Sequence, residues 1–450
     1  MKTGRSANTA TAARSVQGSY TSGVVIAVLG LILLLIASPA TAKIYIDINA
    51  PSLPKLKIAI PDFKNLSDKG EHPELSARLS QVVAGDLDLS GYFLPLDKES
   101  YLEGAESPLT LEEIRFKNWS VLGAELLLRG AYTCVGSRLE VEIRLFDVIW
   151  GRQIMGKRVL GEVAGYRRVM HRVGNEIIRK LTGHEGIFLT RLAFVGTMTG
   201  HKEIYTCDYD GRNLKRVTWD RSIALLPRWS PDGKRLLYNS YRDGGPMLFM
   251  RDMVSGKVRR LSGRKGLNIG AAWLPDGKRL ALTLSRRGNP DIFLIDLNGK
   301  ILDRLTKHWA IDVSPTFSPD GKKMAFVSSR SGSPQIYVRN LSDGREERLT
   351  FEGGYNTSPA WSSRNRIAFV SMDGGRFEIY AMDPDGTGLR KLTDGTGNNE
   401  DPCWSPDGRY IVFSSNREGS YHLYLMNANG QNQRKIVSLK GDQTAPSWVR

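Results

Sequence analysis

The amino-acid sequence predicts two folded domains, a small α/β N-terminal domain followed by an all-β six-bladed β-propeller. Two observations carry this prediction. Residues 187–450 repeat with a period of about 44 residues, and each period holds four short strand patterns. Residues 53–183 lack the repeat and mix strand patterns with apolar residues at helical spacing. At 450 residues the chain is too long for one ordinary hydrophobic core, which agrees with more than one domain.

Residues 1–42 are predicted to be a signal peptide. Their only charges are three basic residues, Lys2, Arg5 and Arg14, and an uninterrupted apolar stretch over residues 23–37 follows. The segment ends in Ala40-Thr41-Ala42, the small-x-small form of a signal-peptidase site. A membrane anchor is the alternative, but fifteen helical residues at ~1.5 Å each cover roughly 22 Å of a ~30 Å hydrocarbon core. We expect cleavage after Ala42, which removes three positive charges and lowers the net charge from +16 to +13.

Residues 43–52 are predicted to form a partner-binding strand between this leader and the first domain. Ile44, Ile46 and Ile48 alternate with polar or amphipathic residues, and Pro51 and Pro54 separate the stretch from the domain. Two interpretations stay open. The stretch is either an edge strand of the domain or a free strand that adds to the sheet of a partner.

The α/β domain, residues 53–183, begins with a strand and a helix. Leu56–Ile60 has the composition of a strand, and Pro73–Leu89 carries apolar residues at helical spacing. Proline suits the first helical position, so we place the start of this helix at Pro73. Residues 111–122 predict a second, weaker helix.

The second half of this domain is predicted to be a hairpin and a long helix. Glu125–Tyr132 and Arg138–Asp147 resemble two strands joined around Gly136-Ser137. Tyr166–Leu181 is amphipathic and is expected to stop near Gly183, because glycine favours helix C-termini.

An aromatic residue, usually followed by Ser-Pro-Asp-Gly, is the first anchor of the repeat. Its copies are 44, 44, 44, 43 and 44 residues apart: Trp229, Trp273, Phe317, Trp361, Trp404 and Trp448. Ser-Pro-Asp-Gly predicts a hairpin turn, because proline presets φ, aspartate bonds back to the local backbone and glycine takes the left-handed position. The fifth copy lacks the motif, and we expect Asn365 to take the positive φ there.

Three further anchors complete each period. They are a basic residue leading an apolar strand, an apolar-aromatic-x-x-Asp/Asn pattern, and a Leu/Val-Ser/Thr pair. Four anchors predict four strands, A to D, in each blade. The first repeat, from Arg191, lacks strand A, whereas residues 444–450 hold strand A alone. We therefore expect the C-terminal strand 444–450 to complete the first blade and close the ring.

The residues that would carry catalysis, a metal or a cofactor do not cluster in the sequence. The six histidines show no ligand spacing, and a nucleophile elbow, a zinc-protease motif and a P-loop are absent. Three distant cysteines, Cys134, Cys207 and Cys403, are interpreted as small buried residues. Basic residues are spread over the repeats, which argues against nucleic acid. We predict a non-enzymatic protein without catalytic, metal or cofactor residues. The alternative is a propeller hydrolase or lyase that acts on a glycan at the channel mouth.

The six loops between strand D and the next strand A vary most between repeats. All six precede the innermost strand, so we expect them to gather on one face around the channel. Apolar and aromatic residues ringed by polar ones are typical of a protein-binding hot spot. The alternative is that these loops are simply polar and variable. The residues predicted to form the binding face are Arg221, Ile223, Arg264, Leu267, Asn268, His308, Trp309, Tyr355, Asn356 and Asn399.

The whole arrangement resembles the TolB family of the Tol-Pal system. The resemblance covers residues 43–450 and is most specific at the junction, residues 181–195, which read Leu-Thr-Gly-His-Glu-Gly-Ile-Phe-Leu-Thr-Arg-Leu-Ala-Phe-Val. Supporting stretches are residues 119–124, 128–132 and 144–147. The Pro-Asp-Gly turns alone are less specific, because other propellers carry them.

This resemblance implies a binding role in the Gram-negative periplasm. The propeller face would bind the lipoprotein Pal, and the N-terminal segment would bind the C-terminal domain of the inner-membrane protein TolA. Together they would support outer-membrane integrity, its constriction during cell division, and protein transport, with contacts to other outer-membrane proteins and the chain itself a monomer. Carried over by position, the TolA-binding residues are Lys43, Ile44, Tyr45, Ile46, Asp47, Ile48, Asn49 and Ala50.

Overall fold

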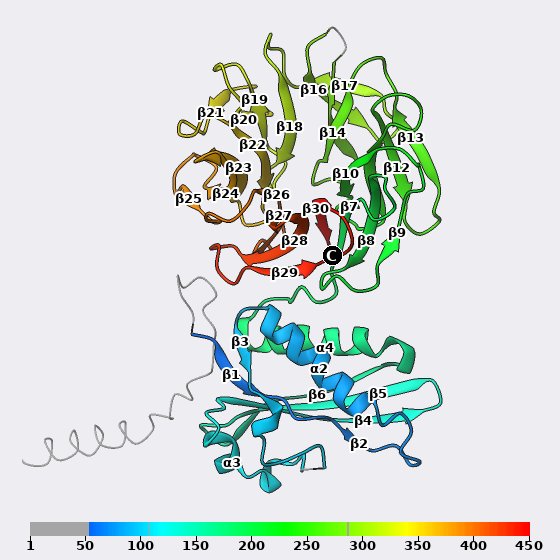
Figure 1. Ribbon diagram of the computed structural model, residues 1–450, viewed down its shortest axis with the longest axis vertical. Coiled ribbons are helices and arrows are strands. Elements are labelled where there is room, and N and C mark those ends of the chain that lie inside the picture. The colour runs from blue at the N-terminus through cyan, green and yellow to red at the C-terminus, as the bar shows by residue number, and fades with distance from the viewer. Residues whose placement is uncertain (1–53, 107, 286–287) are drawn as a thin grey trace, which may run out of the picture. The chain divides into compact units, whose positions relative to one another are not determined.

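The computed structural model describes residues 54–106, 108–285 and 288–450 (Figure 1). The predicted leader, residues 1–42, and the predicted partner-binding strand, residues 43–52, lie outside these ranges. Within them, no helix combines the length and the apolar character needed to cross a membrane. The predicted fold class is confirmed, because an α/β region is followed by a six-bladed β-propeller.

A six-stranded mixed sheet is the centre of the α/β domain. Its main path is β3 (Phe93–Pro95), β1 (Leu56–Ala59), β4 (Leu126–Val135), β5 (Arg138–Asp147) and β6 (Arg152–Glu162), and β2 (Lys64–Asn65) pairs with β4. β1 runs parallel to β3 and β4, whereas β4, β5 and β6 form an antiparallel meander. The predicted hairpin around Gly136-Ser137 is therefore present, and its first strand is longer than expected.

Two helices, α2 (Leu75–Leu89) and α4 (Tyr166–Thr182), pack against each other and against this sheet (Figure 1). α4 confirms the predicted amphipathic helix, and Gly183 ends it with a φ of 75°. α2 begins at Leu75, later than the predicted Pro73. The carbonyl of Pro73 accepts a bond from the amide of Ser76 only three residues on, so the chain is still a turn there.

The single weak helix predicted over residues 111–122 is wrong. The structure has a 3₁₀ turn at Leu111–Glu113 and a separate short helix, α3 (Phe116–Ser120). Ile114 is extended between them, with a ψ of 125°. Ile114 and Trp119 are 8% and 1% exposed and belong to one apolar cluster. A continuous helix would set these two side chains about 140° apart around its axis, so the break lets both enter the same core.

Three strands of this domain, β2, β3 and β6, were not predicted. β6 pairs with β5 from Arg138↔Glu162 to Asp147↔Arg152. Most of its side chains are exposed or half-buried on both faces, so its sequence shows no alternation of apolar and polar residues.

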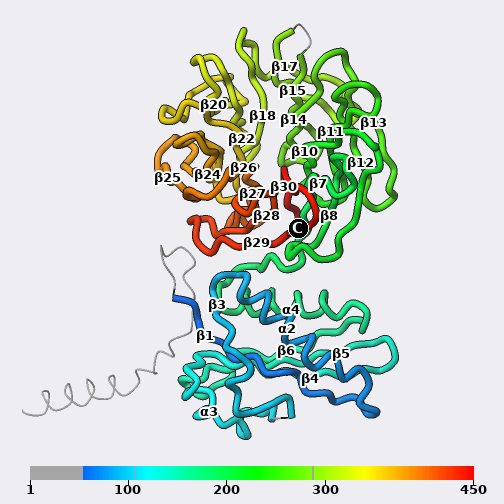
Figure 2. Tube along the Cα trace, in the orientation of Figure 1, coloured from blue at the N-terminus to red at the C-terminus, as the bar shows by residue number. Residues whose placement is uncertain are grey.

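The propeller consists of six four-stranded antiparallel sheets, each in the order A-B-C-D (Figure 2). They are β10 (Ala224–Trp229), β11 (Arg235–Ser240), β12 (Met247–Asp252) and β13 (Val258–Ser262); β14 (Asn268–Trp273), β15 (Arg279–Leu284), β16 (Asp291–Asp296) and β17 (Ile301–Arg304); β18 (Asp312–Phe317), β19 (Lys323–Ser328), β20 (Gln335–Asn340) and β21 (Glu346–Arg348); β22 (Asn356–Trp361), β23 (Ile367–Asp373), β24 (Arg376–Met382) and β25 (Arg390–Lys391); β26 (Asn399–Trp404), β27 (Tyr410–Glu418), β28 (Ser420–Asn427) and β29 (Arg434–Val437); and β30 (Gln443–Val449), β7 (Arg191–Gly196), β8 (Glu203–Asp208) and β9 (Lys215–Arg216).

The C-terminal strand β30 supplies strand A of the blade that begins with β7. The two strands are antiparallel, with Thr444 opposite Val195 and Trp448 opposite Leu192. The indole nitrogen of Trp448 donates a hydrogen bond to Thr190 Oγ1 at 2.7 Å. The ring is therefore joined through backbone pairing between the two ends of the repeat.

The turns between strands A and B have the geometry that their sequence predicts. Gly233, Gly321 and Gly408 have φ values of 66°, 69° and 69°, and Asn365 takes the same position with a φ of 58°. In the first of these turns, the amide of Lys234 donates to Asp232 Oδ1 at 3.1 Å. The repeated aspartates are thus part of the turn structure.

Candidate protein-binding face

The six loops from strand D to the next strand A meet at one end of the propeller. Each leads from the outermost strand of a blade to the innermost strand of the next. We call this surface the loop face. Two layers build it, a buried polar belt below and exposed apolar side chains above.

A buried acid or amide at the start of strand C forms the belt in four blades: Glu203, Asp291, Gln335 and Glu378. The threonine of the Leu/Val-Thr anchor lies against it. In these blades the amide of the next strand-C residue donates to the threonine hydroxyl at 2.8 to 3.0 Å. Thr350 in turn donates to Gln335, at 2.7 Å. In these four blades the fourth anchor of the repeat therefore fixes the beginning of the loop.

Three predicted face residues, Asn268, Asn356 and Asn399, are fully buried, and the last two bond to the belt. The side-chain amide of Asn356 donates to Gln335 Oε1 at 2.8 Å, and that of Asn399 donates to Glu378 Oε2 at 2.9 Å. These asparagines fix the ends of three of the six loops. Their side chains are used inside the blade rather than presented to a partner.

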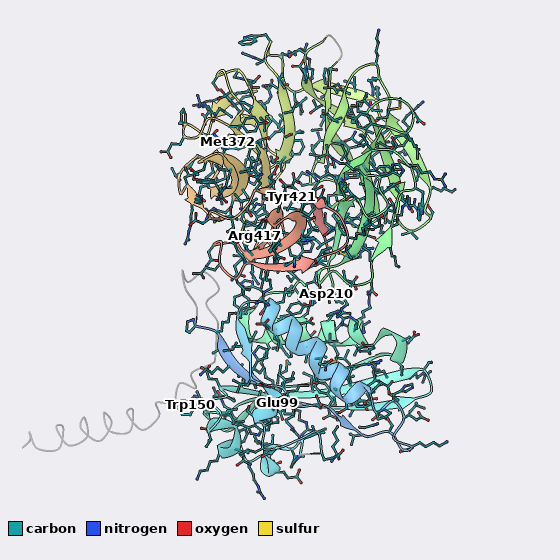
Figure 3. The ribbon with its side chains drawn as sticks, in the orientation of Figure 1. Glu99, Trp150, Asp210, Met372, Arg417 and Tyr421 are labelled. Atoms are coloured by element: carbon teal, nitrogen blue, oxygen red, sulfur yellow. The ribbon has the colours of Figure 1, made fainter. Side chains whose placement is uncertain are left out.

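Arginines at the ends of two B strands brace the loop face. The guanidinium of Arg330 lies 3.1 Å from Asp312 Oδ2 and 4.8 Å from the ring centre of Tyr337. Burial raises the pKa of Asp312, although its bonds to Ser328 and Arg330 act in the opposite direction. Arg417 of β27 (Figure 3) has its guanidinium carbon 4.5 Å from the ring centre of Tyr424, which belongs to β28. Burial lowers the pKa of this arginine.

Trp309 is the most exposed of the predicted apolar and aromatic residues of the loop face, at 79%. Its loop is held from below, because the side-chain amide of Asn289 donates to the carbonyls of His308 and Ala310 at 2.6 and 2.9 Å. His308 Nδ1 accepts the amide hydrogen of Ala310 at 3.1 Å. The imidazole is thus part of the loop, and it positions the exposed indole beside it.

The remaining predicted residues divide into exposed and supporting groups. Ile223 and Tyr355 are exposed, and so is Arg221, whose backbone amide donates to Glu203 Oε1 at 3.1 Å. Arg264 is half-buried and donates to the carbonyl of Gly299 at 2.6 Å. Leu267 is also half-buried, and its amide donates to Ser285 Oγ.

Two exposed aromatic residues of the loop face, Trp219 and Phe351, were not predicted. They are 60% and 74% exposed, and each directly follows the anchor threonine. Arg216 and Arg348 lie over their rings, at 5.6 and 5.0 Å from the ring centres. An aromatic residue immediately after Val-Thr or Leu-Thr was the sequence signal. Phe351 also borders a cavity of about 570 Å³ lined by Leu349, Met372 and Leu389.

A second cavity, of about 520 Å³, is lined by the innermost strands and the turns between strands A and B. Its titratable lining residues are Arg228, Asp401 and the half-buried Cys403. Asp401 Oδ2 accepts the amide hydrogen of Ala445 at 3.0 Å, so its carboxylate is tied to the neighbouring strand. Most glycoside hydrolases need two carboxyl groups across the scissile bond, and this cavity offers one. Among the described residues, no group of His, Cys, Asp and Glu side chains is placed to hold a metal ion.

Two family models match the chain. The TolB β-propeller domain matches residues 178–450, and the TolB amino-terminal domain matches residues 44–154. The two matches together cover most of the chain, including the loop face.

Individual relatives agree with this family. The chain is 43% identical over 230 residues to a Tol-Pal system protein TolB of Desulfosudis oleivorans, and 39% identical over 213 residues to one of Syntrophus aciditrophicus. These matches cover 50% and 46% of this chain and 52% and 47% of the relatives, about half of each length. A crystal structure of TolB from Acinetobacter baumannii superimposes with a TM-score of 0.76 at 28% identity, over 88% of this chain and 96% of that one.

Proposed function

The chain belongs to the TolB family, and from this premise we propose that it is a non-enzymatic, periplasmic binding protein that links two partners. The loop face binds the lipoprotein Pal. Residues 43–50 bind the C-terminal domain of TolA. Through these two contacts the protein supports outer-membrane integrity and the constriction of the outer membrane during cell division.

The exposed indole of Trp309 is the observation that carries the Pal assignment. Large aromatic side chains on a rigid, hydrogen-bonded base lose little conformational entropy on binding and dominate many protein interfaces. Trp219 and Phe351 present two more exposed rings, each directly after the anchor threonine of its own loop. The arginines stacked against both rings favour fixed orientations of these side chains in the free protein.

The TolA assignment rests on the sequence of residues 43–50. Three isoleucines alternate with polar or amphipathic residues, so an extended conformation would present one apolar edge. Such a segment suits addition to the sheet of a partner, where main-chain bonds give affinity and alternate side chains give specificity.

Calorimetric titration of the mature chain, from Lys43 to Arg450, with the soluble domain of Pal tests the first assignment. We expect Trp309→Ala to weaken binding at least tenfold, a loss of about 1.4 kcal/mol. Trp150→Ala is the matched control, because Trp150 is 67% exposed but lies in the α/β domain (Figure 3). Unchanged binding by Trp309→Ala, or equal losses in both variants, would refute the assignment.

Deletion of residues 43–50 tests the second assignment. The shortened chain should lose binding to the TolA C-terminal domain and retain the Pal affinity of the full chain. Loss of both interactions, or of neither, contradicts a division of labour between the N-terminal segment and the loop face. Serine at positions 44, 46 and 48 keeps the length of the segment and should reproduce the loss of TolA binding.

A further inference from the structure

The β6 strand leaves one edge of the α/β sheet open among the residues that the structure describes. β6 stands at the end of the strand order and pairs only with β5 there. It is 11 residues long. Folded proteins usually shorten, bend or cover such an edge, because its unpaired backbone groups can accept another strand.

The backbone groups that face outward follow from the hairpin between β4 and β5. Val135 and Arg138 flank the two-residue turn and form a hydrogen-bonded pair, so every second residue of β5 from Leu139 points toward β6 instead. In β6 this pairs Val159 and Lys157 with β5 and turns the backbone groups of Gly156, Arg158 and Leu160 outward. The carbonyl of Leu160 accepts a bond from Arg172 at 3.0 Å, which agrees with its outward direction.

The side chains on the α4 side of this edge are mainly cationic. A Cβ on Gly161 would lie 2.3 Å from Val169 of α4, so odd-numbered β6 residues face that helix. Lys157 and Met155 line a shallow pocket together with Glu176, Arg179 and Lys180 of α4. Glu176 lies 3.3 Å from Lys157 and 2.5 Å from Arg179, and Glu185 lies 3.8 Å from Arg179. Three cations therefore meet two carboxylates here, which leaves a net charge of +1.

The opposite side of the edge is different. Arg158 lies 2.8 Å from Glu140 of the neighbouring strand, so its charge is paired. Leu160 is 64% exposed and presents an apolar side chain next to the open backbone. A strand added to β6 would therefore meet positive charge on one side and a small apolar surface on the other.

We propose that the β6 edge binds an extended acidic polypeptide segment by β-augmentation. The segment adds as a further strand and bonds with the outward amides and carbonyls of Gly156 and Arg158 and with the outward amide of Leu160. Acidic side chains at alternate positions face Lys157, Arg179 and Lys180, and the intervening uncharged side chains lie on the Leu160 side. Arg172 marks one end of the site, because it already occupies the carbonyl of Leu160.

A capped heptapeptide of alternating valine and glutamate, titrated into the mature full-length chain, tests this site. Binding should weaken with added salt, and Lys157→Gln with Lys180→Gln should raise the Kd at least fivefold. Lys234→Gln with Lys278→Gln is the matched control, because it removes the same charge from exposed propeller turns and should leave the Kd unchanged. The same peptide with alternate N-methylated residues keeps its charge but cannot pair through its backbone, so it should bind at least tenfold more weakly.

Amide hydrogen exchange gives a direct readout of the pairing. In the free chain the amides of Gly156 and Arg158 should exchange faster than those of Lys157 and Val159, and the peptide should slow the first pair.

Equal binding of the N-methylated peptide, or of a polyanion such as heparin, would show attraction by charge alone and overturn the proposal. Equal weakening in both lysine pairs, or absent binding at millimolar peptide, would also overturn it. Pal and TolA titrations of the Lys157 and Lys180 variant should be unchanged, which separates this site from the proposed function.

Discussion

The propeller and the α/β domain treat the edges of their sheets in opposite ways. In the propeller, β30 joins the two ends of the repeat, and the outermost strands are only two to five residues long. In the α/β domain, the 11-residue β6 leaves an edge unpaired among the described residues. The closed ring leaves its loops to contact partners through side chains, whereas the open sheet offers its backbone as well.

Removing the closing strand should have the largest effect, because it turns the closed ring into an open one. Deletion of residues 444–450 exposes the inner edge of β7 and removes the buried Trp448 and Val449. Loss of one large buried aromatic residue alone costs about 3–5 kcal/mol, a large part of a typical folding free energy. We expect the propeller to lose its cooperative thermal transition and to aggregate. Deletion of Arg450 alone, which lies beyond β30, should leave the melting temperature unchanged.

The packing of neighbouring blades also restricts which residues fit into the turns between strands C and D. Gly299 has a φ of 80°, and a Cβ there would lie 2.1 Å from the carbonyl oxygen of Leu261 in the preceding blade. Gly299→Ala should lower the free energy of unfolding by about 4 kcal/mol, from backbone strain and overpacking together. Gly70 of the α/β domain has a φ of 62° with no atom within 4 Å of its Cβ position. Gly70→Ala should cost about 1–2 kcal/mol in chemical denaturation, and equal costs would contradict a tighter propeller.

Proline substitutions at adjacent β6 positions should reveal which backbone groups are paired. Lys157→Pro removes an amide that points toward β5 and should cost about 3 kcal/mol. Arg158→Pro removes an outward amide, and we expect a cost of about 1 kcal/mol, since proline is tolerated on open strand edges. Equal losses in urea denaturation would mean that the outward amide is already bonded, and the open edge would be refuted.

Repetition explains why most of the propeller could be predicted from sequence. Each anchor recurs at one place in every blade, so six weak local patterns support one another, and even the substitute Asn365 could be assigned its positive φ. The α/β domain has no such redundancy. β6 could not be predicted, because side chains on both of its faces are exposed and its sequence therefore shows no alternation of apolar and polar residues. The helix expected over residues 111–122 is broken because Ile114 and Trp119 both pack into one apolar core, and the local sequence does not encode that long-range packing.

The loop face was predictable in position and less so in composition. Its place follows from the order of strands, and Trp309 was identified by its exposed loop. The sequence places Asn268, Asn356 and Asn399 on this face because they lie in the loops between strands D and A. Asn268 is buried against the backbone carbonyls of Arg264 and Gly266, whereas Asn356 and Asn399 are buried against Gln335 and Glu378, because these buried polar groups need partners. Burial of this kind depends on two adjacent blades and is not visible in one loop sequence.

The smallest predicted effect concerns Glu400, the second residue of β26, which accepts a hydrogen bond from Tyr421 of β28. Burial raises the pKa of its carboxyl above the ordinary value of 4.5, with Asp401 acting in the same direction and the bond from Tyr421 opposing them. A raised pKa means that the folded state favours the protonated carboxyl. The stability that this preference contributes is fully present at pH values below the pKa of Glu400 in the unfolded state, and it is lost as pH rises through the pKa of Glu400 in the folded state. The free energy of unfolding of the wild type, taken relative to that of Glu400→Gln, should therefore be larger near pH 3 than near pH 7.

The carboxyl is partly exposed, so we expect this relative free energy to change by less than about 1 kcal/mol between denaturation experiments at the two pH values. Tyr421→Phe removes the opposing bond and should extend the pH range of the loss upward. A relative stability of the wild type that rises with pH would contradict this assignment of the Glu400 environment.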